Sequence, residues 1–117
     1  MQTEYGIDVT WADKPDYCGK ILVFEKLGSK MHFHFHKETK KSWFVNAGSF
    51  IIRCIDTTTG KMVTHPLQEG AVFDVDVLQP VSLEVTSQGG GTVLQVGTKN
   101  EKNDTYIITP ADSIGGN

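Results

Sequence analysis

The stretch GSKMHFHFHKETKKSWFVNAG, residues 28–48, decides how this chain of 117 residues folds. Three histidines alternate in it with Phe33 and Phe35, and a glycine stands at each end. Alternate residues of an extended strand project from the same face. His32, His34 and His36 are therefore expected to project together into the interior, with the two phenylalanines on the opposite face. The stretch predicts a strand with a histidine-lined inner face.

The same period of two continues along the rest of the chain, where runs rich in Val, Ile, Phe and Thr alternate with turns rich in Gly, Thr and Ser. No helical stripe is present to cover a parallel sheet. The sequence therefore predicts an all-β, antiparallel barrel or sandwich. The expected strand segments are residues 17–26, 30–36, 42–56, 61–66, 71–77, 80–86 and 92–98.

The length is that of one domain. We expect the barrel to span residues 14–110. Residues 1–13 are expected to form an N-terminal arm that crosses the barrel or a neighbouring subunit, and residues 111–117 a flexible tail.

Charge and composition narrow the choice of partners. Eleven basic and fourteen acidic residues give a net charge of −3, which argues against nucleic acid or an anionic membrane as the main partner. The first residues lack both a basic start and an apolar run, and no segment approaches the roughly 20 apolar residues of a membrane span. We expect a cytoplasmic protein in which Cys18 and Cys54 are reduced thiols.

The spacing along a strand limits which of the three histidines can bind the same metal ion. Neighbouring members of the trio lie about 6.7 Å apart along a strand and can bind one ion. His32 and His36 are about 13 Å apart and cannot easily do so.

Several short motifs extend the pattern. They are His34-Phe35-His36 followed by Trp43-Phe44-Val45 and Gly48, Trp11-Ala12 followed by residues 17–22, Leu67-Gln68-Glu69-Gly70 followed by Phe73 and Pro80, and Asn103-Asp104-Thr105-Tyr106. In these motifs, over about residues 10–109, the chain resembles a cupin. It is more narrowly similar to the C-terminal cupin domain of bifunctional mannose-6-phosphate isomerases. The resemblance implies a jelly-roll β-barrel.

The resemblance also implies a metal site, which this sequence alters. The family's four ligands correspond to His34, His36, Lys41 and Val81, so a lysine and a valine stand where a glutamate and a histidine are usual. A cation about 5 Å from a divalent ion costs roughly 6 kcal/mol at an effective dielectric constant of 20. Structural zinc sites bind with only about 10–16 kcal/mol. A divalent metal (Mn, Fe, Ni or Zn) at His34 and His36 is therefore expected to be weakly held or absent.

Other interpretations of these residues stay open. The His34/His36 pair could be metal-free pocket residues, a non-standard metal site or surface histidines. Lys41 could belong to a solvated run of lysines or hold an anion. We take His32, Lys41 and Trp43 as candidate substrate-binding residues. The side chains that could replace a missing ligand are Asp74, Asp76, Gln79 and His32.

Three classes of function follow. The favoured one is a binding module for a small sugar or anionic metabolite in the barrel mouth. The second is a metal-dependent sugar-phosphate isomerase or epimerase that uses His34 and His36. The third is a structural cupin without a site. The resemblance further implies a homodimer, for which Ile7, Val9 and Trp11 supply an apolar stripe on the arm.

Overall fold

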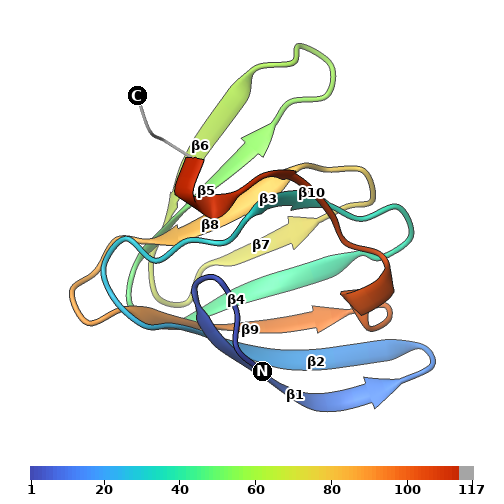
Figure 1. The fold of residues 1–117 in the computed structure, drawn as a ribbon, viewed down its shortest axis with the longest axis horizontal. Coiled ribbons are helices and arrows are strands. Elements are labelled where there is room, and N and C mark those ends of the chain that lie inside the picture. Colours follow the sequence, from blue (N-terminus) through green and yellow to red (C-terminus); the bar gives the residue numbers. More distant parts are fainter. Residues whose placement is uncertain (114–117) are drawn as a thin grey trace.

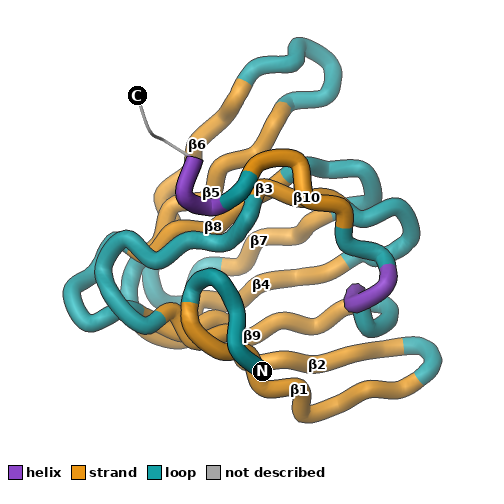
Figure 2. The backbone as a smooth tube through the Cα atoms, in the orientation of Figure 1, coloured by secondary structure: helices purple, strands orange, loops and turns teal. Residues whose placement is uncertain are grey.

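The computed structural model describes residues 1–113, which form β-strands and two short 3-10 helices (Figures 1 and 2). The described residues include no α-helix, so the predicted all-β class is confirmed. No helix among them is long or apolar enough to cross a membrane. The elements are β1 (Gly6–Lys14), β2 (Tyr17–Phe24), β3 (Phe33–Phe35), β4 (Lys41–Ala47), β5 (Phe50–Ile55), β6 (Met62–Leu67), β7 (Val72–Val75), β8 (Val81–Val85), β9 (Gly91–Gly97), η1 (Glu101–Asn103), β10 (Tyr106–Thr109) and η2 (Ala111–Ser113).

The strands make two antiparallel five-stranded sheets around one core. The first has the order β1-β2-β9-β4-β7 and lies in the lower half of Figure 1; the second, β10-β3-β8-β5-β6, lies above it. Inward side chains of both sheets fill the space between them because alternate residues of each strand point inward. The largest of these fully buried side chains are Trp43, Phe24, Phe50, Leu22 and Ile52. The predicted antiparallel barrel is therefore confirmed.

The histidine stretch runs along β3 and the turn after it. His34 lies opposite Val81 of β8, and His34 and His36 have ring centroids 5.1 Å apart. β3 begins only at Phe33, so His32 lies just before the strand and does not join the other two rings. On the other face, Phe35 stacks on Tyr106 of β10.

The predicted strand over residues 42–56 is in fact two strands in different sheets. β4 belongs to the first sheet and β5 to the second, and the chain turns between them at Gly48. Gly48 has a φ of +85°, which favours glycine. A Cβ atom there would lie 2.7 Å from Oγ of Ser87 and 2.9 Å from the carbonyl oxygen of Gly90. The buried positions shift by one residue across the turn, from Trp43 and Val45 to Phe50 and Ile52.

Residues 1–13 and the described part of the predicted tail, residues 111–113, are parts of the fold. Residues Gly6–Lys14 form β1, an edge strand paired along β2. Before it, Tyr5 is buried and stacks on Phe24, with ring centroids 4.3 Å apart. At the other end η2 begins at the buried Ala111, and the rest of the predicted tail, residues 114–117, lies outside the described part of the chain.

Candidate functional site

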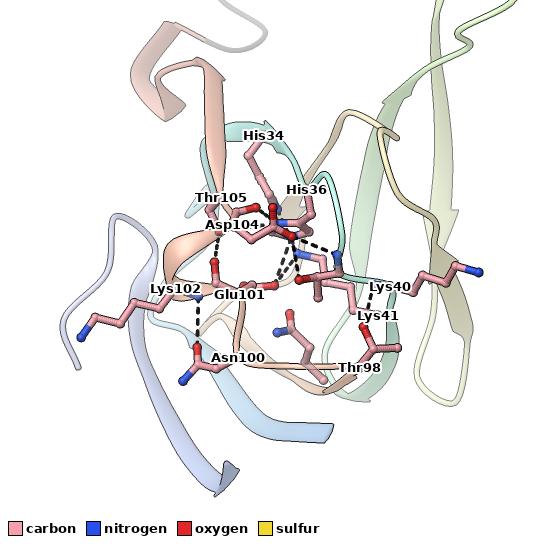
Figure 3. Close-up of polar contacts among 12 residues, drawn as sticks. His34, His36, Lys40, Lys41, Thr98, Asn100, Glu101, Lys102, Asp104 and Thr105 are labelled. Carbon is pink, nitrogen blue, oxygen red and sulfur yellow. Dashed lines mark hydrogen bonds and ion pairs between the residues drawn. The ribbon is translucent and has the colours of Figure 1, made fainter. Parts of the chain in front are cut away.

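Lys41 lies at the centre of a buried polar cluster between the sheets (Figure 3). Its ammonium donates to Nε2 of His34 (3.0 Å) and to a carboxylate oxygen of Glu101 (3.2 Å). Because Nδ1–H of His34 donates to the carbonyl oxygen of His32 (2.8 Å), Nε2 of the neutral ring is free to accept. The ammonium also lies 4.7 Å from the centre of the Trp43 ring, within range of a cation–π contact.

His36 is fully buried beside this cluster. Its Nδ1–H donates to the carbonyl oxygen of Asp104 (2.9 Å). Its Nε2 lies 3.1 Å from the same Glu101 oxygen that Lys41 contacts. Nε2 has no hydrogen-bond partner within residues 1–113. One oxygen of Glu101 thus lies near both the Lys41 ammonium and Nε2 of His36.

Asp104 fixes the turn that leads into β4. Its carboxylate accepts from the backbone N–H groups of Lys37, Glu38 and Thr39 and from the Thr39 hydroxyl, at 2.8 to 3.1 Å. Burial by itself would raise the pKa of Asp104, but these hydrogen bonds outweigh it and lower the pKa to about 2. The ionised carboxylate thereby holds the turn that precedes Lys41.

The charges of the cluster balance internally. Burial, helped by the nearby Lys41 ammonium, lowers the pKa of His34 to about 3, so this ring is neutral. Burial also lowers the pKa of Lys41, and the carboxylate of Glu101 opposes that shift. Burial would raise the pKa of Glu101, but Lys41 and His36 hold it well below its usual range. Lys41 and Glu101 thus form a buried ion pair inside the barrel.

The residues present do not fit a metal ion. The acceptor nitrogen of His34 and the carboxylate of Glu101 are both engaged by an ammonium, and Val81, opposite His34, offers no donor atom. In the described part of the chain no three His, Cys, Asp or Glu side chains are arranged to hold a metal. The metal expected at His34 and His36 therefore meets a positive charge that the protein itself supplies.

None of the proposed substitute ligands reaches this cluster. Asp74 and Asp76 are on the exposed outer surface, and Gln79 donates to the carbonyl oxygen of Ile55. His32 is turned away: its Nδ1 accepts from the backbone N–H of Ala111, and its own N–H donates to Glu4. The carboxylate that does reach the cluster comes from Glu101 in η1, which the sequence analysis did not select.

A cavity of about 640 Å³ opens beside the cluster, between the N-terminal segment and the inner face of the first sheet. Lys41, His34 and Glu101 form one of its walls. His32 lies at its edge. Trp43 is fully buried behind Lys41 and is not among the lining residues; its Nε1–H donates to Gln95 (2.8 Å). Thr10, Lys20, Leu22 and Gln95, which lie on β1, β2 and β9 of the same sheet as Lys41, also line the cavity.

Sequence reasoning missed Glu101, Lys20 and Gln95. Lys20 does carry a signal, because it occupies an inward position in the alternating run with Leu22 and Phe24, where a charged residue is unusual. Gln95 interrupts the apolar inward positions of β9 in the same way. Glu101 lies in a connecting segment, and only the fold brings it to Lys41.

Comparison with solved structures supports the fold. No protein-family model and no curated protein matches the sequence. The capsular polysaccharide assembling protein CapF from Staphylococcus aureus superposes with a TM-score of 0.79 at 16% identity, over 90% of this chain and 30% of CapF. An uncharacterised conserved protein with a double-stranded β-helix domain from Klebsiella pneumoniae gives a TM-score of 0.72 at 12% identity, covering 86% of this chain and 82% of that one.

Oxalate decarboxylase from Bacillus subtilis also superposes, with a TM-score of 0.72 at 20% identity, over 86% of this chain and 27% of that chain. This chain thus spans about a third of CapF and about a quarter of the decarboxylase. At these identities the likeness establishes the architecture, which is the double-stranded β-helix or cupin fold, and leaves the activity to be argued from the site.

Proposed function

We propose that this protein binds a small sugar or anionic metabolite in the cavity between its sheets, and that the Lys41 ammonium stands in place of a bound metal ion. The observation that supports the proposal best is the cavity of about 640 Å³. Ligand pockets for small molecules have volumes of about 300–1,000 Å³. The wall that Lys41 forms is preorganised, because His34 and Glu101 fix the ammonium before any ligand arrives.

The narrower resemblance to the cupin domain of mannose-6-phosphate isomerases makes hexoses and their derivatives the first ligands to test. A metal-dependent isomerase or epimerase is the weaker proposal. It would need a metal at His34 and His36, where the ammonium of Lys41 is already bound to His34. We therefore favour binding without a metal.

Binding can be tested by calorimetry and thermal unfolding with D-glucose, D-gluconate and D-glucose 6-phosphate. A ligand at 100 times its Kd stabilises the folded state by about 2.7 kcal/mol. Thr10→Phe places a ring at an exposed position of the cavity wall and should abolish the stabilisation. Thr58→Phe, in the exposed turn between β5 and β6, is the matched control and should bind as wild type does. Absence of binding to all three compounds, or equal binding by both variants, would contradict the proposal.

We also propose that the protein is a homodimer formed through the outer face of the first sheet. Val9, Ile21, Leu94, Phe44 and Val72 are cross-strand neighbours in that order and form one apolar row over all five strands. All except Ile21 are exposed. With strands about 4.8 Å apart the row is roughly 19 Å wide. A long uncharged row of this kind suits a second copy of itself better than a charged partner.

Light scattering tests the dimer. Phe44→Asp, at the centre of the row, should give a folded monomer. Met62→Asp, at an equally exposed apolar position on β6 of the other sheet, should leave the dimer intact. A wild-type protein that is monomeric at tens of micromolar would refute this assembly.

A further inference from the structure

Lys20 is a buried cation that has no partner in the described part of the chain. It lies on β2 between two neighbouring strands, β1 and β9, so the sheet fixes its backbone on both sides. Its side chain points inward, lines the cavity and is only 8% exposed. It makes no hydrogen bond or ion pair with any residue from 1 to 113, whereas Lys41, on β4 of the same sheet, has two partners.

The acidic side chains of the cavity are all engaged elsewhere. Glu4 accepts from the backbone N–H of His32, Asp8 lies 3.9 Å from the N-terminal amine, and Glu101 pairs with Lys41. An ammonium group that is largely removed from water and has no counter-charge is unfavourable by several kcal/mol. A methionine or leucine would continue the apolar inward row of β2 at no such cost. The unpaired charge of Lys20 therefore indicates that an anionic ligand supplies its counter-charge.

Gln95 places a second set of donors beside Lys20. The two residues are directly opposite each other on β2 and β9, and Gln95 is 4% exposed and lines the same cavity. The indole of Trp43 can only donate, so the oxygen of the Gln95 amide must face Trp43. The NH₂ group is then directed away from the indole. It has no partner among the described residues, so both of its protons are available to a ligand.

We propose that Lys20 and Gln95 form a carboxylate-binding site, and that the ligand of the cavity is a small hydroxylated monocarboxylate of the sugar-acid class. The inference rests on the proposed ligand-binding function. Cross-strand neighbours have Cβ atoms about 4.5–5.5 Å apart, close enough for an ammonium and an amide to share one carboxylate. Hydrogen bonds from an ammonium to a carboxylate are about twice as strong as neutral ones. Thr10, the other cross-strand neighbour of Lys20, offers its hydroxyl to a hydroxyl of the ligand.

The charge balance of the cavity favours a single negative charge. Three lysines (Lys20, Lys41 and Lys102) and the N-terminal amine line it, together with three carboxylates (Glu4, Asp8 and Glu101), so four positive groups face three negative ones. Lys102 is exposed, and Lys41 is neutralised by Glu101. One uncompensated buried cation therefore remains, at Lys20. A monocarboxylate matches it, whereas a phosphate dianion would add a charge that the carboxylates of the cavity repel.

Titration calorimetry with D-gluconate, D-glucose and D-glucose 6-phosphate tests this assignment. We expect gluconate to bind more tightly than either of the others. Lys20→Met should weaken gluconate at least about 10-fold, the loss typical of a hydrogen bond to a charged group, and leave glucose unchanged. Lys102→Met removes a second cavity lysine and should have little effect. If Lys20→Met changes neither ligand while both still bind, the carboxylate site is wrong and the binding function stands. If none of the three compounds binds, the binding function fails as well.

Gln95→Glu provides a second, independent test. The new carboxylate can still accept from Trp43, and it places an anion beside Lys20 in the position of the ligand's own carboxylate. We expect the variant to unfold at a higher temperature than wild type and to lose gluconate binding. Nuclear magnetic resonance supplies the direct readout: the side-chain NH₂ signals of Gln95 should shift on titration with acetate and not with its neutral analogue acetamide. Equal shifts with both, or glucose 6-phosphate binding more tightly than gluconate, would overturn the assignment.

Discussion

Two buried lysines face the same cavity in different electrostatic settings. Lys41 is 4% exposed and Lys20 is 8% exposed, so burial does not distinguish them. Lys41 has a carboxylate at 3.2 Å and an imidazole acceptor at 3.0 Å, whereas Lys20 has only uncharged cross-strand neighbours, Thr10 and Gln95. The presence of a partner therefore decides the role of a buried charge. Lys41 stabilises the fold through its ion pair with Glu101, and Lys20 is available to bind a ligand.

The largest change that this comparison predicts is a gain of metal binding. Lys41→Glu with Val81→His replaces the cation by a ligand and adds a donor opposite His34. Removing the like charge alone is worth roughly 6 kcal/mol, on the order of 10⁴-fold in affinity for zinc or manganese. Val81→His alone keeps the Lys41 ammonium and should raise the metal affinity only slightly. The measurement is calorimetric titration together with elemental analysis, and a wild-type protein that retains one equivalent of metal through dialysis would contradict the role of Lys41.

Replacing each lysine separately tests whether Lys41 and Lys20 contribute differently to the stability of the fold. Lys41→Met leaves the carboxylate of Glu101 buried without its cation and should lower the free energy of unfolding by about 3 kcal/mol, as for other broken buried pairs. The double variant Lys41→Met/Glu101→Met should recover most of the loss. Lys20→Met removes a charge that has no partner among residues 1–113 and should leave the free energy of unfolding unchanged. Urea unfolding measures all three, and equal losses for the two single lysine variants would refute the distinction.

The Asp104 carboxylate supports only the Lys41 wall. Asp104→Asn weakens the hydrogen bonds that hold the turn over residues 37–39 and should cost about 2 kcal/mol. Because the pKa of Asp104 is lowered to about 2, its contribution is fully present above its usual pKa near 3.8 and is lost as the pH falls through about 2. Unfolding measured from pH 5 to pH 2 should show this loss in wild type and lack it in the variant. Asp16→Asn, at an exposed position, is the control.

The smallest expected effect concerns Trp43, which contacts both Lys41 and Gln95. Trp43→Phe keeps an aromatic ring behind Lys41 and removes the hydrogen bond to Gln95, which should cost about 1 kcal/mol. The Gln95 amide is then free to rotate, so gluconate binding should weaken several-fold while glucose binding stays the same. Calorimetry on both ligands checks this. An unchanged affinity for gluconate would mean that Trp43 does not orient the amide.

The sequence was most informative about features that neighbours along the chain determine, such as strand formation and the face on which a side chain lies. Alternating apolar residues predicted an all-β chain, because side chains on a strand change face at every residue. The same alternation placed His34 on the inner face, and the motif spacing singled out Lys41. It was misleading over residues 42–56, which are rich in strand-forming residues on both sides of Gly48: the chain turns there into the other sheet.

By itself, then, the sequence determined the class of fold, since that follows from local order, and its resemblance to cupins predicted that Lys41 replaces a metal ligand. Tertiary structure alone decided what that lysine contacts. Glu101 is 60 residues away from Lys41, and Gln95 is 75 residues away from Lys20. Whether a buried charge has a partner depends on which distant segments the sheets bring within about 3 Å, and no local pattern records that distance.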